Sequence, residues 1–86
     1  MSANKTEAEI LEQMLIDIDE SDSFSSRIRS ERGRKVFQVS RSINKTLGAK
    51  AGIEVDDDGD VIAYVRGDLN LTRAVQSVVN KFMGNT

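Results

Sequence analysis

The sequence predicts a small α+β domain in which helices flank a β-hairpin, in the order α-(α)-α-β-β-α. Apolar residues recur at helical spacing in several separate stretches of the sequence. Between two of these stretches, apolar residues instead follow the spacing of β-strands on either side of an acidic turn. Eighty-six residues provide enough chain for one small hydrophobic core. We therefore expect residues 1–86 to form one domain, with a flexible N-terminus at residues 1–5.

The first helix is predicted at residues 7–20. Thr6 and Glu9 have the spacing of a capping box, in which each side chain bonds a backbone N–H near the helix start. The apolar residues that follow lie on one side and most of the acidic residues on the other: Ile10, Leu11, Met14, Leu15 and Ile18 form the apolar side. The serine-rich stretch from residue 21 to residue 26 ends the helix.

The second helical region carries most of the positive charge. Its apolar side is formed by Val36, Val39, Ile43 and Leu47, and the opposite side by Arg27, Arg34, Arg41 and Lys45. Extending this register backwards would bury Arg29 and Arg32 without a partner. We therefore expect a break at Gly33, with a short, weak helix around residues 24–32 and a firm basic helix at residues 34–48.

A β-hairpin at residues 53–65 and a C-terminal helix at residues 70–83 complete the order. Asp56-Asp57-Asp58-Gly59 is strong turn chemistry, and the following strand, Val61 to Val65, is apolar on both faces. The last helix begins near Asp68 or Asn70 as N-cap. One of its faces is apolar and carries Leu71, Val75, Val78, Val79 and Phe82.

The charges fall into three blocks of alternating sign. Residues 1–26 contain seven carboxylates and one lysine, residues 27–50 contain eight cations and one glutamate, and residues 51–68 contain six carboxylates and one arginine. A basic block between acidic blocks is either a footprint for a polyanion or a segment that the acidic blocks neutralise internally. The sequence leaves both possibilities open.

Several function classes are disfavoured by composition. The chain has no cysteine and no histidine, and its acidic pairs lie on a helix end and a turn, so we expect no enzymatic activity, no cofactor and no metal site. The acidic stretch from Asp56 to Asp60 lacks the ligand spacing of an EF-hand and runs directly into a strand. No apolar run is long enough for a membrane span, and we expect a cytoplasmic protein.

These observations lead to a hypothesis of a non-enzymatic regulatory or accessory protein that binds nucleic acid, and specifically duplex DNA, through its basic helix. The candidate contact residues are Arg27, Arg34, Gln38, Arg41, Ser42 and Lys45. The alternative is a protein-interaction module, an inhibitor or adaptor, whose basic helix binds an acidic protein surface. We further expect a homodimer with Ile62 and Tyr64 in its interface, because the second strand is apolar on both faces.

Overall fold

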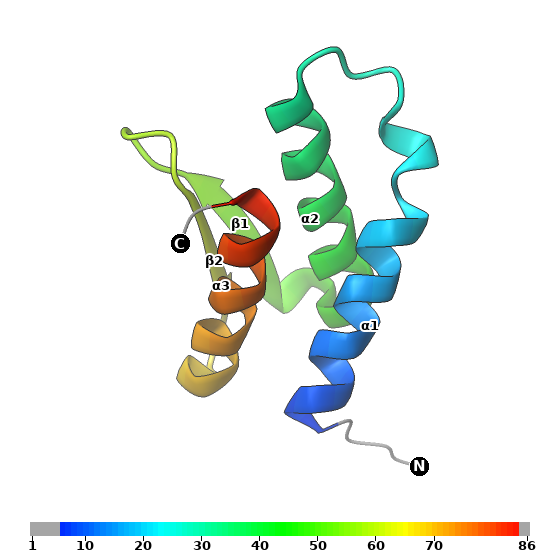
Figure 1. The fold of residues 1–86 in the computed structure, drawn as a ribbon. Coiled ribbons are helices and arrows are strands. Elements are labelled where there is room, and N and C mark those ends of the chain that lie inside the picture. Colours follow the sequence, from blue (N-terminus) through cyan, green and yellow to red (C-terminus); the bar gives the residue numbers. More distant parts are fainter. Residues whose placement is uncertain (1–5, 85–86) are drawn as a thin grey trace.

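The computed structural model describes residues 6–84 and has the predicted α+β architecture (Figure 1). Three helices and one hairpin follow in the order α1 (Glu7–Glu20), α2 (Glu31–Leu47), β1 (Ala51–Val55), β2 (Val61–Val65) and α3 (Leu69–Met83), with single 3₁₀ turns at Ser23–Ser25 and Gly48–Lys50. These elements form one small domain. The flexible terminus expected at residues 1–5 lies outside the described residues.

Helix α1 has the predicted bounds because its caps are local. The Glu9 backbone N–H donates to Thr6 Oγ1 at 3.2 Å, and the Thr6 N–H donates to Glu9 Oε1 at 3.1 Å, so the capping box is confirmed. At the other end the Ser21 hydroxyl donates to the carbonyl of Asp17 at 2.7 Å. A side-chain bond of this kind competes with further helical turns and ends α1 at Glu20.

The expected break at Gly33 and the weak helix around residues 24–32 are wrong. Ser30 Oγ accepts a hydrogen bond of 2.9 Å from the Gly33 N–H, so α2 begins at Glu31 and Gly33 belongs to its first turn. Before Ser30 there is only the 3₁₀ turn and a short irregular stretch. Arg29, which precedes α2, and Arg32, in its first turn, are nevertheless exposed.

The hairpin places one apolar face against α3 and leaves the other open. β1 and β2 are antiparallel, with Gly52 opposite Tyr64 and Glu54 opposite Ile62. Of the two apolar faces of β2, the face of Val61, Ala63 and Val65 is buried within the domain. On the other face Ile62 is 43% and Tyr64 39% exposed. A Cβ on Gly52 would lie 2.6 Å from the Tyr64 hydroxyl oxygen, so the tyrosine ring rests over the glycine and would have to move to admit a side chain there.

The core lies where α2, α3 and the hairpin meet, and α1 closes it by packing on α2 rather than on the sheet (Figure 1). From α2, Val39, Ile43 and Leu47 are buried as expected. In α3 the buried residues are Leu71, Val75, Val79 and Met83, whereas Val78 and Phe82, expected on the apolar face, are only partly covered.

Helix α3 also closes the outer edge of β2. Gln76 accepts from the Ala63 N–H at 2.6 Å and donates to the Val61 carbonyl at 2.9 Å. The Thr72 hydroxyl accepts from the Val65 N–H at 2.9 Å, and its single proton is shared between the carbonyls of Val65 at 3.0 Å and Asp68 at 2.8 Å. Edge strands otherwise expose such groups to pairing with another chain. In this fold these edge groups of β2 are satisfied by the side chains of Thr72 and Gln76, which lie one helical turn apart on α3.

We predict that Gln76→Leu lowers the free energy of unfolding by about 1–3 kcal/mol, because it leaves partly buried groups of β2 without hydrogen bonds. The matched control is Ser77→Leu on the exposed side of the same helix, which should change stability by less than about 0.5 kcal/mol. Urea unfolding measures both variants. Equal midpoints for the two would show that Gln76 does not protect the strand edge.

Candidate functional site

Two of the six predicted contact residues are buried between α1 and α2. The Ser42 hydroxyl donates to the Met14 carbonyl at 2.7 Å, and the Gln38 side chain donates to the Ile18 carbonyl at 3.0 Å. Both side chains lie among the buried polar groups of the domain. Because both side chains are buried, they are not presented to a ligand. Their hydrogen bonds instead fix how far along α1 the helix α2 is placed. We call these two contacts the polar seam.

Lys45, the third predicted residue, pairs with a buried carboxylate of α1. Its Nζ lies 3.6 Å from Oδ1 of Asp17, which is 1% exposed. Burial alone would raise the pKa of Asp17, but the hydrogen bonds donated by Thr46 at 2.7 Å and Gln13 at 3.1 Å, together with the charge of Lys45, outweigh it and lower the pKa. Lys45 thus neutralises an internal charge, although its own side chain remains largely exposed.

Arg34 and Arg41 have partners on the loop between α1 and α2. Arg34 Nη1 donates to the carbonyls of Ile28 and Arg29 at 2.8 and 2.9 Å and so holds the loop on the start of α2. The Arg41 guanidinium carbon lies 4.4 Å from the centroid of the Phe24 ring, and Phe24 is 61% exposed. Arg41 therefore keeps its charge at the surface, on an aromatic platform.

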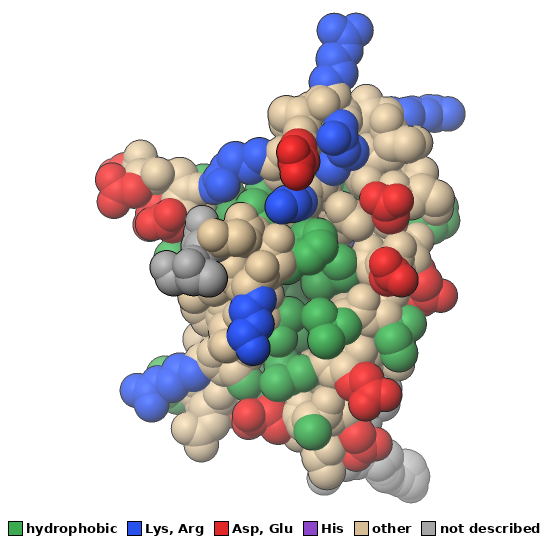
Figure 2. Space-filling view, viewed as in Figure 1, with side chains coloured by type: hydrophobic (Ala, Val, Ile, Leu, Met, Phe, Trp, Pro, Cys, Tyr) green, Lys and Arg blue, Asp and Glu red, His purple; other side chains and the backbone are tan. Residues whose placement is uncertain are grey.

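Three arginines close together in the sequence lie at one end of the molecule. The side chains of Arg27, Arg29 and Arg32 are exposed and make no hydrogen bond or ion pair with any residue from 6 to 84. Lys and Arg side chains gather at this end in Figure 2, with one carboxylate among them and the acidic hairpin tip beside them, and further carboxylates lie along α1. We call these three arginines the basic end. Of the three, only Arg27 was among the predicted contact residues.

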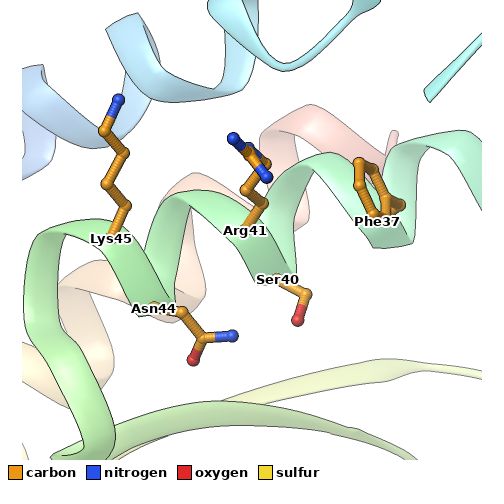
Figure 3. Close-up of a pocket in the computed structure, with 5 residues that line it drawn as sticks. All are labelled: Phe37, Ser40, Arg41, Asn44 and Lys45. Atoms are coloured by element: carbon orange, nitrogen blue, oxygen red, sulfur yellow. The ribbon is translucent and has the colours of Figure 1, made fainter. Parts of the chain in front are cut away.

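The exposed side of α2 forms a furrow of about 620 Å³, lined by Phe37, Ser40, Arg41, Asn44 and Lys45. In Figure 3 Arg41 and Lys45 point toward α1, while Ser40 and Asn44 point toward the hairpin. The lining residues provide two cations, two neutral polar groups and one aromatic ring, and no carboxylate. The middle of α2 is thus flanked by other elements.

The acidic tip of the hairpin has the geometry of a turn. Asp56 Oδ1 accepts hydrogen bonds from the Asp58 and Asp60 N–H groups at 3.0 and 2.8 Å, and Gly59 has a φ of +86°. Carboxylate oxygens of Asp56, Asp58 and Asp60 lie within 4.8 Å of one another, and all three residues are exposed. The backbone bonds to Asp56 explain why the carboxylates meet.

Comparisons with known proteins give no match: no family model, no curated protein and no solved structure is similar to the chain. Within residues 6–84, no helix combines the length and apolar content that crossing a membrane requires.

We predict that Asp17→Asn destabilises the protein by about 1–3 kcal/mol at pH 7, because it removes a buried, hydrogen-bonded charge. A carboxylate whose pKa is lower in the folded state contributes stability above its unfolded pKa of about 3.9, and loses that contribution as the pH falls through the folded value. The difference between wild type and Asp17→Asn should therefore shrink below about pH 4.

Thermal unfolding between neutral and acidic pH measures this difference. Asp19→Asn, at an exposed position two residues further along α1, is the matched control and should follow the wild type closely. A gap between wild type and Asp17→Asn that stays constant with pH would contradict a lowered pKa for Asp17.

Proposed function

We propose that this protein binds duplex DNA without catalysing a reaction, as a regulatory or accessory protein acting as a homodimer, and that the basic end makes the contact. The observation that carries the proposal is that Arg27, Arg29 and Arg32 are exposed, lie within six residues of one another and make no ion pair within the described chain. Arginine side chains are suited to bidentate contacts with phosphate. Three of them at one exposed end favour binding to a polyanion.

The distribution of ion pairs argues against internal neutralisation of the basic block. Among residues 6–84 only two ion pairs are present, Lys35 with Glu31 inside α2, and Lys45 with Asp17 between α2 and α1. Neither involves the basic end. The acidic first helix therefore leaves most of the positive charge of residues 27–50 available for an external anion.

The orientation of α2 favours contact through its N-terminal end rather than its middle. A helix that lies along a major groove must protrude from its domain, whereas α1 and the hairpin flank the middle of α2, with Arg41 and Lys45 pointing toward α1 and Ser40 and Asn44 toward the hairpin (Figure 3). The first turn of α2 extends beyond the core and carries Arg32. Its backbone N–H groups add the positive end of the helix dipole at the same place.

We predict that wild-type protein binds a short DNA duplex with an affinity that falls steeply with salt. Replacing Arg27, Arg29 and Arg32 together by Gln should reduce the slope of log K against log salt by about 3 per protomer, since each neutralised phosphate contributes about 0.9. The matched control replaces three cations at the opposite end of the fold by Gln, namely Lys50, Arg66 and Arg73, and should alter the slope much less.

Fluorescence anisotropy with a labelled duplex between about 50 and 200 mM salt measures these slopes. Binding that is independent of salt, or equal slopes for the two triple variants, would contradict the assignment to the basic end. A complete lack of DNA binding by the wild type would instead favour the alternative, in which the basic end meets an acidic protein surface.

A further inference from the structure

Helices α1 and α3 share one face of the molecule and run in the same direction along it (Figure 1). Apolar side chains gather between the two helices on this face (Figure 2). Leu15 is 53% exposed there, and Leu11, Val78 and Phe82 are only partly buried. We call this surface the α1–α3 face. We propose that it is the contact between two copies of this chain, whose α1 helices meet at Leu15 around a two-fold axis parallel to them.

The turn of the helix places Leu15 on the side of α1 that belongs to this face. Successive residues of an α-helix are rotated by about 100°, so Leu15 lies about 160° from Asp17, whose carboxylate accepts a hydrogen bond from Thr46 of α2. Asp19 lies about 40° from Leu15 and lines, together with Phe82 of α3, a cavity of about 420 Å³. Leu15 therefore faces the same side as this cavity, one turn earlier along α1.

The stripe of α1 on this face has the spacing of a helix pair. Ala8, Leu11 and Leu15 follow one another at intervals of three and four residues and lie within about 60° of one another around the helix. This is the spacing of the contact positions in parallel two-stranded coiled coils. A two-fold axis parallel to α1 brings each of these residues to its counterpart in the second copy at the same level. Small and apolar side chains thus form the centre of the contact.

Opposite charges border this centre on the two helices. Lys81 lies about 60° from Val78 around α3, on the side away from Gln76 and the hairpin. Because Asp19 and Phe82 line one cavity, Asp19 and Lys81 stand near the same level of the molecule. Both are exposed, and neither forms an ion pair with any residue from 6 to 84. Each is therefore available to a charge from another chain.

The two-fold axis brings these two charges together. Rotation about an axis that is parallel to α1 and lies in front of Leu15 keeps the level of every residue. It lays α1 of the second copy against α1 of the first and beside its α3, because α1 and α3 share the face that the axis passes (Figure 1). Asp19 of one copy then stands beside Lys81 of the other, and this pair occurs twice in the closed dimer.

The orientation of the axis has a consequence for the basic end. Since the axis runs parallel to α1, the C-terminal ends of both copies of α1, with the loops that follow them, lie at the same end of the dimer. Arg27, Arg29 and Arg32 of the two copies would then face the same way, as paired contacts with two half-sites of a duplex require. The inference rests on the homodimer of the proposed function and specifies its interface, which uses none of these three arginines.

The exposed hairpin face is the competing interface. Ile62 and Tyr64 share it with Glu54 and Gly52, so a two-fold contact there would enclose a carboxylate from each copy and no cation from these four residues. The α1–α3 face instead brings opposite charges together. Charge complementarity of this kind selects one partner surface over another.

Sedimentation equilibrium at micromolar concentration tests the proposal, and the expected species has twice the monomer mass of 9.5 kDa. Leu15→Lys should weaken the dimer on the order of tenfold or more, because it places two ammonium groups at the axis. Ile16→Lys is the matched control and should leave the dimer unchanged. Ile16 is the next residue and is 45% exposed, but it lies on the side of α1 away from α3, beside Glu9 and Glu12.

Charge reversal tests which helices meet. Lys81→Glu and Asp19→Lys should each weaken the dimer on the order of tenfold, by placing like charges beside one another twice. The double variant restores opposite charges and should recover most of the lost affinity. The neutral change Asp19→Asn removes only an exposed pair and should alter the dimer little.

Unfolding midpoints of each variant establish that the monomer remains folded, since all the substituted side chains are exposed. A single species of 9.5 kDa for the wild type, or the absence of rescue in the double variant, would overturn the proposal. So would a dimer that Tyr64→Lys dissociates and Leu15→Lys does not. The triple variant of the basic end should remain a dimer even where it no longer binds DNA, so failure of the contact and failure of DNA binding are distinct results.

Discussion

The rest of the structure depends on the hydrogen bonds that α2 donates into the backbone of α1. Ser42 and Gln38 reach carbonyls of Met14 and Ile18 that lie within or at the end of a helix. A buried donor must find an acceptor, and these two bonds tie Ser42 to the level of Met14 and Gln38 to the level of Ile18. A small side chain at Ser42 also lets the two helices approach closely. The polar seam thus specifies the relative placement that apolar contacts alone would leave adjustable.

This placement decides how the opposite charges of the two helices interact. It brings Asp17 into the interior, where Thr46, Gln13 and Lys45 satisfy it, and it keeps the other carboxylates of α1 on the outside. Helices of opposite charge therefore pack side by side while sharing one ion pair within the described chain. Exposed pairs contribute little to stability in water, so packing and buried hydrogen bonds hold these helices together.

The sequence predicted the elements with local signals and failed where distant contacts decide. Helix α1 and the hairpin were predictable, because a capping box and an acidic turn act within a few residues. The start of α2 was not predicted, because the charge pattern argued against a helix before Gly33. In the structure the Ser30 side chain caps the helix there by accepting a hydrogen bond from the Gly33 N–H. Gln38 and Ser42 resembled surface residues because they lie among cations, and only the packing of α1 shows that they are buried. Arg29 was not predicted as a contact residue, because its exposure depends on where the core ends.

The side chains by which α3 closes the edge of β2 imply a limit on the length of this hairpin. Thr72 and Gln76 are four residues apart on the helix, a rise of about 6.0 Å, and they serve Val65 and Ala63, two residues apart on the strand, a rise of about 6.6 Å. A mismatch of about 0.6 Å per step is tolerable once but accumulates along the strand. The side chains of a helix can therefore satisfy the edge of a strand, as a third strand would, only over a short distance. The edge of a longer β2 would extend past α3 into solvent.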